Sequence, residues 1–146
     1  MRFVLEFIAT LSATVFCGAA VYVNLVEHPA RLACGTKIAA TVWGPSYKRA
    51  TLMQAPLAIL SFLGGVMVWF LGGGNWWLIA ALCTGAVVPF TFLAIMPTNH
   101  RLEESDRELE SGETRALLEK WGRLHAVRSM LSVVASVIYV SLLVGA

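Results

Sequence analysis

Hydrophobic positions along the chain are gathered into four long, almost uncharged stretches. They cover residues 3–26, 52–71, 76–96 and 124–144. About 20 apolar residues in a helix, each adding about 1.5 Å, cross the roughly 30 Å hydrocarbon layer of a bilayer. Because lipid offers backbone groups no hydrogen-bond partner, each stretch is predicted to be a helix. The pattern therefore predicts an all-α fold, a four-helix transmembrane bundle that forms one domain over residues 1–146.

The link between the second and third stretches is only four residues long, 72–75, and three of them are glycine. Such a short link predicts an antiparallel helical hairpin. Trp69, Trp76 and Trp77 flank this link, and tryptophan is enriched where membrane helices meet the headgroups. We therefore expect these three side chains to anchor the hairpin at the membrane surface. The first stretch is too long for a typical signal-peptide core, which favours a retained helix.

Positive charge is distributed unevenly between the segments that connect the stretches. Residues 27–51 and 97–123, which we interpret as two longer loops, hold four and five Lys or Arg residues. The opposite end of the bundle holds only Arg2. Because basic residues favour the cytoplasmic side, both loops are predicted to be cytoplasmic and both termini outside. The sequence thus predicts a multi-pass protein of the cell membrane.

Composition supports this interpretation and removes several classes of function. Hydrophobic residues make up 58% of the chain and charged residues 14%, whereas charged residues make up about 25% of ordinary soluble domains. The net charge of +2 is too small to indicate binding to nucleic acid. The three cysteines, Cys17, Cys34 and Cys83, match no zinc or redox spacing. We therefore predict no metal site, and the lipid bilayer and a small hydrophobic ligand as partners.

Small residues recur at intervals of four within the stretches. Ala9, Ala13 and Cys17 form one such series, and Ser61 and Gly65 another. Small residues at this spacing let membrane helices approach closely. These positions predict tight helix packing.

The last stretch carries a polar stripe along one face. Trp121, His125, Arg128, Ser132 and Tyr139 follow one another at steps of four, three, four and seven, which places them on the same side of a helix. An arginine facing lipid at the bilayer centre costs about 2.5–3.5 kcal/mol. Arg128 is therefore predicted to face the bundle interior or to extend to the nearby membrane surface.

The other three stretches also carry polar residues at the end that bears the basic loops. Those residues are Asn24 and His28 on the first stretch, Tyr47 and Gln54 on the second, and Asn99 after the third. Asn99 is equally suited to cap a following helix. Polar groups converging from four helices predict a mostly apolar pocket with a few oriented polar groups, as is typical of ligand sites.

Local signals predict where two helices begin. Ser46 is suited to cap the second helix, and Ser111, followed by Gly112 and Glu113, to cap the last one. We expect the last helix to begin outside the membrane and to continue unbroken through it. Gly122 within this helix predicts that another group approaches beside Trp121.

Four segments occur in order along nearly the whole chain: NLVEHPAR, WGPSYKRA, VPFTFLAIMPTNHRL and LLEKWGRLHAVRSML. Together they resemble the anthrone oxygenase-like family, a group of small membrane proteins with four spans. The most specific pieces are Pro97 with Asn99, and the series Trp121, His125 and Arg128.

The resemblance implies an O₂-dependent oxidation of a hydrophobic hydroxyaromatic, such as an anthrone, to a quinone, without a required metal or flavin. That reaction needs a base that removes a proton from carbon. His125 suits this role because its reference pKa is about 6.5. Arg128 is placed to stabilise the oxyanion and Asn99 to orient the substrate. Trp121, Tyr47, Asn24, His28 and Gln54 are the predicted substrate-binding residues.

Three other interpretations remain open from the sequence, one of which is a structural or assembly subunit with no site. His28 and His125 lie at similar depth on different helices, a pattern that also suits a haem-binding redox carrier. A pocket of this kind equally suits binding or transport of a small hydrophobic ligand or lipid. The sequence also leaves open whether the chain forms a homo-oligomer.

Overall fold

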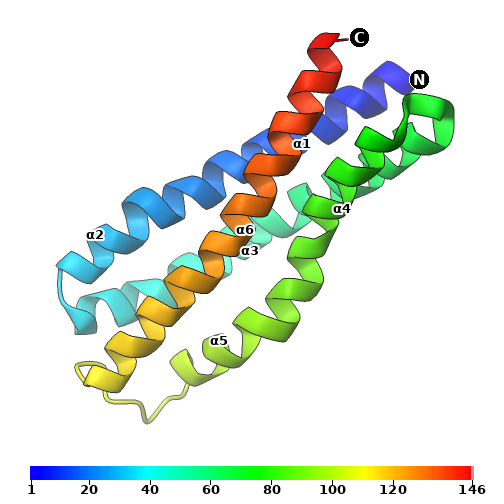
Figure 1. The fold of residues 1–146 in the computed structure, drawn as a ribbon. Helices are drawn as coiled ribbons and strands as arrows, with labels where there is room; N and C mark the ends of the chain where they lie inside the picture. Colours follow the sequence, from blue (N-terminus) through cyan, green and yellow to red (C-terminus); the bar gives the residue numbers. More distant parts are fainter. Residues whose placement is uncertain (146) are drawn as a thin grey trace.

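Four helical rods, each long and apolar enough to cross a bilayer, make up the molecule (Figure 1). A computed structural model describes residues 1–145, and these contain no strand. The predicted all-α, four-helix transmembrane bundle is thereby confirmed, and the protein is a multi-pass membrane protein. The elements in chain order are α1 (Arg2–Tyr22), the π-helical turn η1 (Val23–Glu27), α2 (His28–Ala33), α3 (Thr36–Val68), the turn η2 (Trp69–Gly73), α4 (Asn75–Phe90), the π-helical turn η3 (Thr91–Ile95), α5 (Met96–Leu102) and α6 (Gly112–Gly145).

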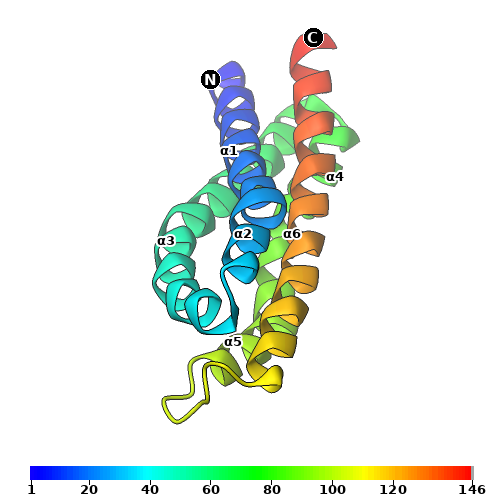
Figure 2. The same ribbon diagram turned by 90° about the vertical axis from the view of Figure 1, so that its left-hand side faces the viewer.

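The rods pack as a four-membered ring in which neighbours run in opposite directions. The rod that begins with α1 contacts α3 and α6, and α4 contacts the same two helices from the other side. Both termini lie at one end together with η2 (Figure 1). The turn between α2 and α3 and the loop between α5 and α6 lie at the other end, where that loop extends past the helices (Figure 2). We call this second end the basic end.

The helices continue well beyond the predicted spans, so the two predicted loops are mostly wrong. Residues 27–51 are helical except for a tight turn at Cys34 and Gly35, where Gly35 has a φ of 97°. The second predicted loop, 97–123, shrinks to residues 103–111. Ser46 lies inside α3 and caps no helix. Most of the basic residues that suggested loops, such as Lys37, Lys48 and Arg123, lie on exposed helix surfaces, because a helix that leaves the membrane can continue with its polar side chains in water. Arg31 is buried instead, and Arg107 lies in the remaining loop.

The hairpin between α3 and α4 is confirmed. Gly72 and Gly74 have φ values of 79° and 93°, a conformation that costs glycine little and most other residues more. Trp76 is 60% exposed, as expected of a surface anchor, but Trp77 is only 3% exposed. The expectation for Trp77 is wrong because its ring packs inside the bundle, 5.2 Å from the Tyr139 ring.

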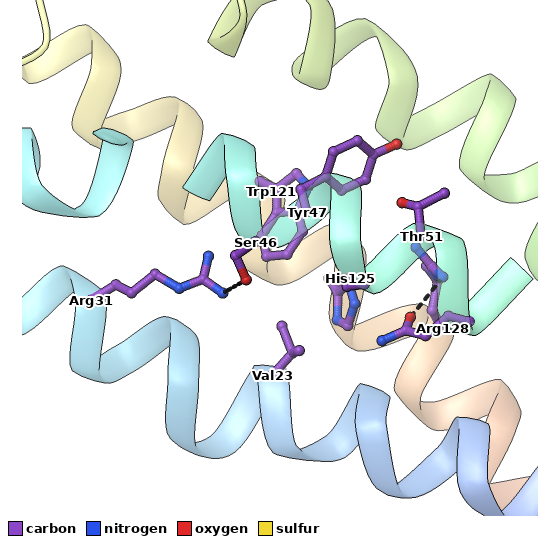
Figure 3. A pocket seen from close by; sticks show the side chains of 10 residues that line it. Val23, Arg31, Ser46, Tyr47, Thr51, Trp121, His125 and Arg128 are labelled. Atoms are coloured by element: carbon purple, nitrogen blue, oxygen red, sulfur yellow. Dashed lines mark hydrogen bonds between the residues drawn. The ribbon is translucent and has the colours of Figure 1, made fainter. Parts of the chain in front are cut away.

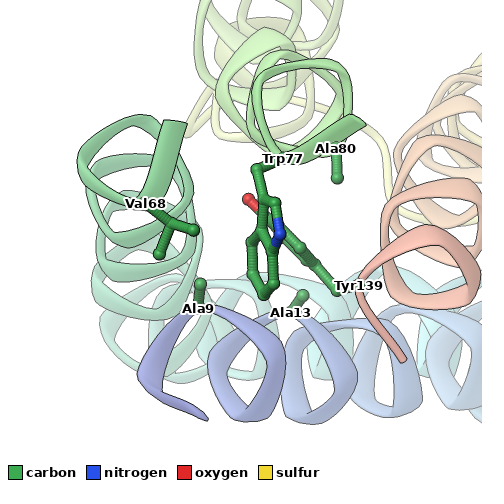
Figure 4. Close-up of a cluster of buried hydrophobic side chains, with 6 residues drawn as sticks. All are labelled: Ala9, Ala13, Val68, Trp77, Ala80 and Tyr139. Carbon is green, nitrogen blue, oxygen red and sulfur yellow. The ribbon is translucent and has the colours of Figure 1, made fainter. Parts of the chain in front are cut away.

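The core is built from successive clusters along the bundle. At the end with the termini, small residues let two large rings fit between the helices (Figure 4). This cluster consists of Ala9, Ala13, Val68, Trp77, Ala80 and Tyr139. A Cβ added at Gly64 would lie 3.1 Å from the Cβ of Ala9, so α1 and α3 approach as closely there as their small residues allow.

The last helix begins as predicted. The Ser111 hydroxyl accepts a hydrogen bond from the Thr114 backbone N–H at 3.1 Å, which is the typical N-cap contact. From Gly112 onward α6 runs for 34 residues to the opposite end of the bundle. It therefore carries its polar stripe from the basic end into the interior.

Candidate functional site

The polar stripe of α6 faces the interior of the bundle. His125 is 2% exposed and Arg128 is 8% exposed, while Ser132 and Tyr139 are fully buried. Trp121 is 3% exposed and joins a core cluster with Val23, Trp43 and Leu118, among others. The guanidinium of Arg128 is therefore enclosed by protein and does not extend to the membrane surface.

Two adjoining cavities lie around these side chains. The smaller, of about 10 Å³, has room for about one water molecule and is lined by several polar side chains (Figure 3). The larger, of about 110 Å³, is mostly apolar and lies deeper between α3, α4 and η3. Four residues line both: Tyr47, Thr51, Gln54 and Arg128. His125, Trp121, Arg31 and Ser46 line only the smaller cavity, and Phe16, Val87 and Phe92 only the larger one.

Arg128 is a buried cation with no acidic partner. Its Nη2 donates to Gln54 Oε1 at 3.1 Å, and its Cζ lies 5.7 Å from the centre of the Phe16 ring. No ion pair among residues 1–145 includes Arg128. Its Nε is buried without a hydrogen-bond partner among these residues. Because an unpaired buried charge is costly, this arrangement suits an anionic group in the cavity.

His125 is held from two sides. Its Nδ1 lies 2.7 Å from Asn24 Oδ1, and its ring stacks on Trp121 with centroids 4.9 Å apart. The ring of His28 lies 5.1 Å from the same indole. These contacts leave the imidazole of His125 little freedom to rotate.

The remaining predicted site residues divide into two groups. Tyr47 and Gln54 line both cavities, and Tyr47 stacks on Trp43 at 5.3 Å. Asn24, His28 and Asn99 lie outside the walls that the structure gives these cavities. Asn99 is not a cap: it lies inside α5, 1% exposed, with Nδ2 3.7 Å from the Met96 sulfur.

Arg31 is a site residue that the sequence reasoning missed. It is 8% exposed, forms an ion pair with Glu27, and donates to the Ser46 hydroxyl at 3.0 Å. Its Nε and Nη1 have no partner among the described residues. Assigning residues 27–51 to a loop hid this residue. The i,i+4 spacing of Glu27 and Arg31 was the signal that could have found it, because that spacing is typical of a helix.

The structure also bears on haem and metal binding. Residues 1–145 contain no group of three or more His, Cys, Asp or Glu side chains placed to hold a metal ion. His28 Nε2 lies 2.9 Å from the Leu118 carbonyl oxygen. Axial ligation of haem through this nitrogen would therefore break an existing hydrogen bond within the bundle.

A family model described as "Anthrone oxygenase" matches residues 43–138, about two thirds of the chain. The chain belongs to the anthrone oxygenase family. The resemblance noted from the sequence is thereby confirmed, and the protein is a member of a membrane-associated, oxygenase-like family. No solved structure matches the chain.

Curated fungal relatives are similar to parts of the chain. An anthrone oxygenase from Aspergillus fumigatus is 41% identical over 70 residues, covering 46% of this chain and 44% of the relative. One from Aspergillus novofumigatus is 42% identical over 57 residues, covering 37% and 35%. One from Pestalotiopsis fici is 31% identical over 116 residues, covering 68% of this chain and 80% of the relative. The chain thus spans less than half the length of the first two relatives.

The anthrone oxygenase match includes most of the cavity wall but not all of the site. Tyr47, Gln54, His125 and Arg128 fall within residues 43–138. The polar residues of η1 and α2 precede this range, although they contact the matched part of α6. In the family member described here, the first rod therefore completes a site whose other walls come from the matched region.

Proposed function

We propose that this chain is a membrane oxygenase that uses O₂ to oxidise a hydrophobic, hydroxylated aromatic compound of the anthrone type to a quinone. The observation that carries this proposal is the unpaired, buried guanidinium of Arg128 on the same small cavity as the imidazole of His125. A cation and a base on one sheltered cavity suit a reaction in which a carbon-bound proton leaves and an oxyanion develops.

The reaction balances with O₂ as the oxidant. His125 takes one proton from the methylene carbon, and the electron pair left behind delocalises through the ring onto the carbonyl oxygen, where Arg128 stabilises the negative charge. The electron-rich carbon then transfers electrons to O₂ and forms a C–O bond with it. Proton uptake by the outer oxygen gives a hydroperoxide. Loss of water from the hydroperoxide gives the carbonyl. One oxygen atom of O₂ ends in the quinone and the other in water, and the sequence of steps needs no metal or flavin.

The larger cavity and an adjoining groove together suit an aromatic substrate, although the cavity alone is too small for one. Its volume of about 110 Å³ is below the roughly 150 Å³ of a cavity known to take up benzene. A compound with three fused rings therefore needs further space. A groove of about 590 Å³ between α3 and α4 shares Ala58 and Val88 with the larger cavity. In this proposal the substrate extends into the groove, its oxygen lies near Arg128, which lines both cavities, and its methylene carbon reaches the smaller cavity, which His125 lines.

The test is turnover by the purified protein in lipid nanodiscs with a hydroxylated anthrone. We expect O₂ uptake and quinone absorbance above the uncatalysed rate. His125→Gln should lower kcat by about 10²–10⁴-fold, and Arg128→Gln by about 10²–10³-fold. Arg123→Gln is the matched control, because Arg123 lies on α6 but is exposed, and it should retain the wild-type rate.

Two results would contradict the proposal. Wild-type rates in both site variants would remove His125 and Arg128 from the chemistry. Saturable binding of the anthrone with no O₂ uptake would favour the other candidate, a binding or transport protein for small hydrophobic molecules, which the apolar groove also suits.

A further inference from the structure

Asn24, on the π-helical turn η1, contacts the imidazole that the proposed reaction uses as its base. We propose that Asn24 is a positioning residue that fixes the proton of neutral His125 on Nδ1 and leaves Nε2 as the free lone pair facing the cavity. This inference rests on the proposed function for its catalytic meaning, whereas the tautomer itself is a property of the resting protein. It also assigns Asn24 a role different from the substrate contact that the sequence predicts.

The first step is the orientation of the Asn24 amide. Its Nδ2 lies 3.0 Å from the backbone carbonyl oxygen of Gly122. A carbonyl only accepts hydrogen bonds, so the NH₂ group of the amide must face it. The opposite orientation would place two oxygen atoms against each other. The carbonyl of Gly122 therefore directs Asn24 Oδ1 toward the other side, where His125 lies.

The second step is the proton on the imidazole. Asn24 Oδ1 lies 2.7 Å from His125 Nδ1, and an amide oxygen can only accept. Nδ1 must then donate, which means that it carries the hydrogen. A neutral imidazole has a single N–H, so Nε2 is left unprotonated. The hydroxyl of Ser129, 2.6 Å from Asn24 Oδ1, donates to the same oxygen and holds it in place.

The third step is the direction of the free nitrogen. His125 lines the smaller cavity whereas Asn24 does not, so the Nδ1 edge is turned toward η1 and away from the cavity. A half-turn of the ring would exchange the two nitrogens. The stacking on Trp121, with centroids 4.9 Å apart and planes at 29°, opposes that rotation in a site where His125 is 2% exposed.

The direct test is nuclear magnetic resonance of the protein in nanodiscs, with histidine labelled with the heavy nitrogen isotope. The His125 signals are assigned by their loss in His125→Gln. We expect wild-type His125, when neutral, to carry its hydrogen on Nδ1. Ser129→Ala, the matched control, removes one hydrogen bond to Asn24 Oδ1 but leaves His125 its acceptor, and should keep this tautomer. Asn24→Ala removes the acceptor and should shift the population toward hydrogen on Nε2.

Kinetics supply a second readout that a purely structural role would not produce. Asn24→Ala should lower kcat for the hydroxylated anthrone by at least about tenfold, since a general base contributes about 10²–10⁴-fold. KM should stay near the wild-type value, because Asn24 does not line the substrate cavity. Asn24→Asp loses the hydrogen bond to the Gly122 carbonyl but keeps an oxygen that accepts from Nδ1, and it should therefore retain more of the rate than Asn24→Ala.

The outcomes separate this inference from the proposed function. Wild-type His125 with its hydrogen on Nε2 would overturn the role of Asn24 and needs no variant to fold. An unchanged tautomer in Asn24→Ala would overturn it as well. The expected tautomers together with no turnover of any anthrone would support the role of Asn24 in the resting protein while contradicting the proposed oxygenase.

Discussion

At the scale of single residues, the basic end differs from the rest of the bundle in its unsatisfied polar atoms. Native proteins normally give buried polar groups a hydrogen-bond partner. Here five side chains have buried nitrogens with no partner among the described residues: His28, Arg31, Trp43, Trp121 and Arg128. Three of these five side chains line the smaller cavity. This concentration of unpartnered donors around one cavity supports the proposal that the cavity binds a ligand.

Gly122 permits the closest contact in this region. A Cβ at this position would lie 2.7 Å from Cδ2 and 2.8 Å from Nε2 of His28. We therefore expect Gly122→Ala to displace His28 from the Leu118 carbonyl, with an overpacking cost of about 1–3 kcal/mol. Replacing glycine with alanine in a helix gains about 1 kcal/mol of helix propensity, and the overpacking cost equals or exceeds this gain. The variant should unfold at a lower temperature in detergent and turn over more slowly.

Gly44→Ala is the matched control for that variant. Gly44 also lies in a helix near the basic end, but nothing lies within 4 Å of an added Cβ. It should unfold at or above the wild-type temperature. Equal unfolding temperatures for the two variants would mean that His28 moves aside freely, and the close contact would then have no structural importance.

How far the site could be predicted from sequence depends on the residue. Helical spacing alone placed His125 and Arg128 on one face of α6, and Gly122 indicated a close approach that the structure assigns to His28. Spacing could not reveal that Asn24 contacts His125, because the two are 101 positions apart. It also could not show that Asn99 is buried without lining either cavity. Contacts between helices depend on how each helix is rotated about its axis and on how deep each residue lies in the bundle. The sequence of a single segment encodes neither.

At the scale of elements, two π-helical turns flank the site. The turn η1 carries Asn24, and η3 carries Thr91 and Phe92, which line the larger cavity. Such turns occur often at functional sites because they interrupt the regular helical register. The four spans were predictable from hydropathy, whereas these turns were not, because an apolar segment has the same composition in either helix type. The sequence thus predicted the bundle but not the local changes that shape its cavity.

The opposite end of the bundle depends on small residues. A Cβ at Gly65 would lie 2.0 Å from the Tyr139 hydroxyl oxygen and 3.0 Å from the Ala81 Cβ. Gly65→Ala should therefore lower the unfolding temperature, at a cost of about 1–3 kcal/mol. Tyr139→Phe removes the clashing oxygen, although it also removes the hydrogen bond to the Ser61 carbonyl at 3.1 Å. We expect the double variant to be more stable than the sum of the two single effects.

A double-mutant cycle measured by thermal unfolding in one detergent tests this coupling. Gly18→Ala is the control, since Gly18 is helical and has nothing within 4 Å of an added Cβ. If the changes in unfolding temperature of Gly65→Ala and Tyr139→Phe were strictly additive, the contact between α3 and α6 at these two residues would be contradicted.

At the scale of the whole molecule, the two ends perform different tasks. The end with the termini holds small residues and two interlocked rings, Trp77 and Tyr139, and serves packing (Figure 4). The basic end holds the buried cations and the cavities. This separation suits a reaction in the membrane, because rigid packing at one end fixes the helices while the site at the other end keeps room for a ligand.

The position of the basic end relative to the membrane leads to the last prediction. Nine of the chain's Lys and Arg residues lie in segments 27–51 and 97–123, so the positive-inside bias predicts that this end faces the cytoplasm. Cys34 is exposed at the turn between α2 and α3, whereas Cys17 and Cys83 are half-buried. We therefore expect a membrane-impermeant maleimide to leave Cys34 unlabelled in intact cells and to label it after permeabilisation.

In a Cys34→Ser background, Gly145→Cys at the opposite end should label in intact cells, since its Cβ meets nothing within 4 Å. Labelling of Cys34 in intact cells, with Gly145→Cys protected, would reverse the topology and place the proposed site on the outer side of the membrane.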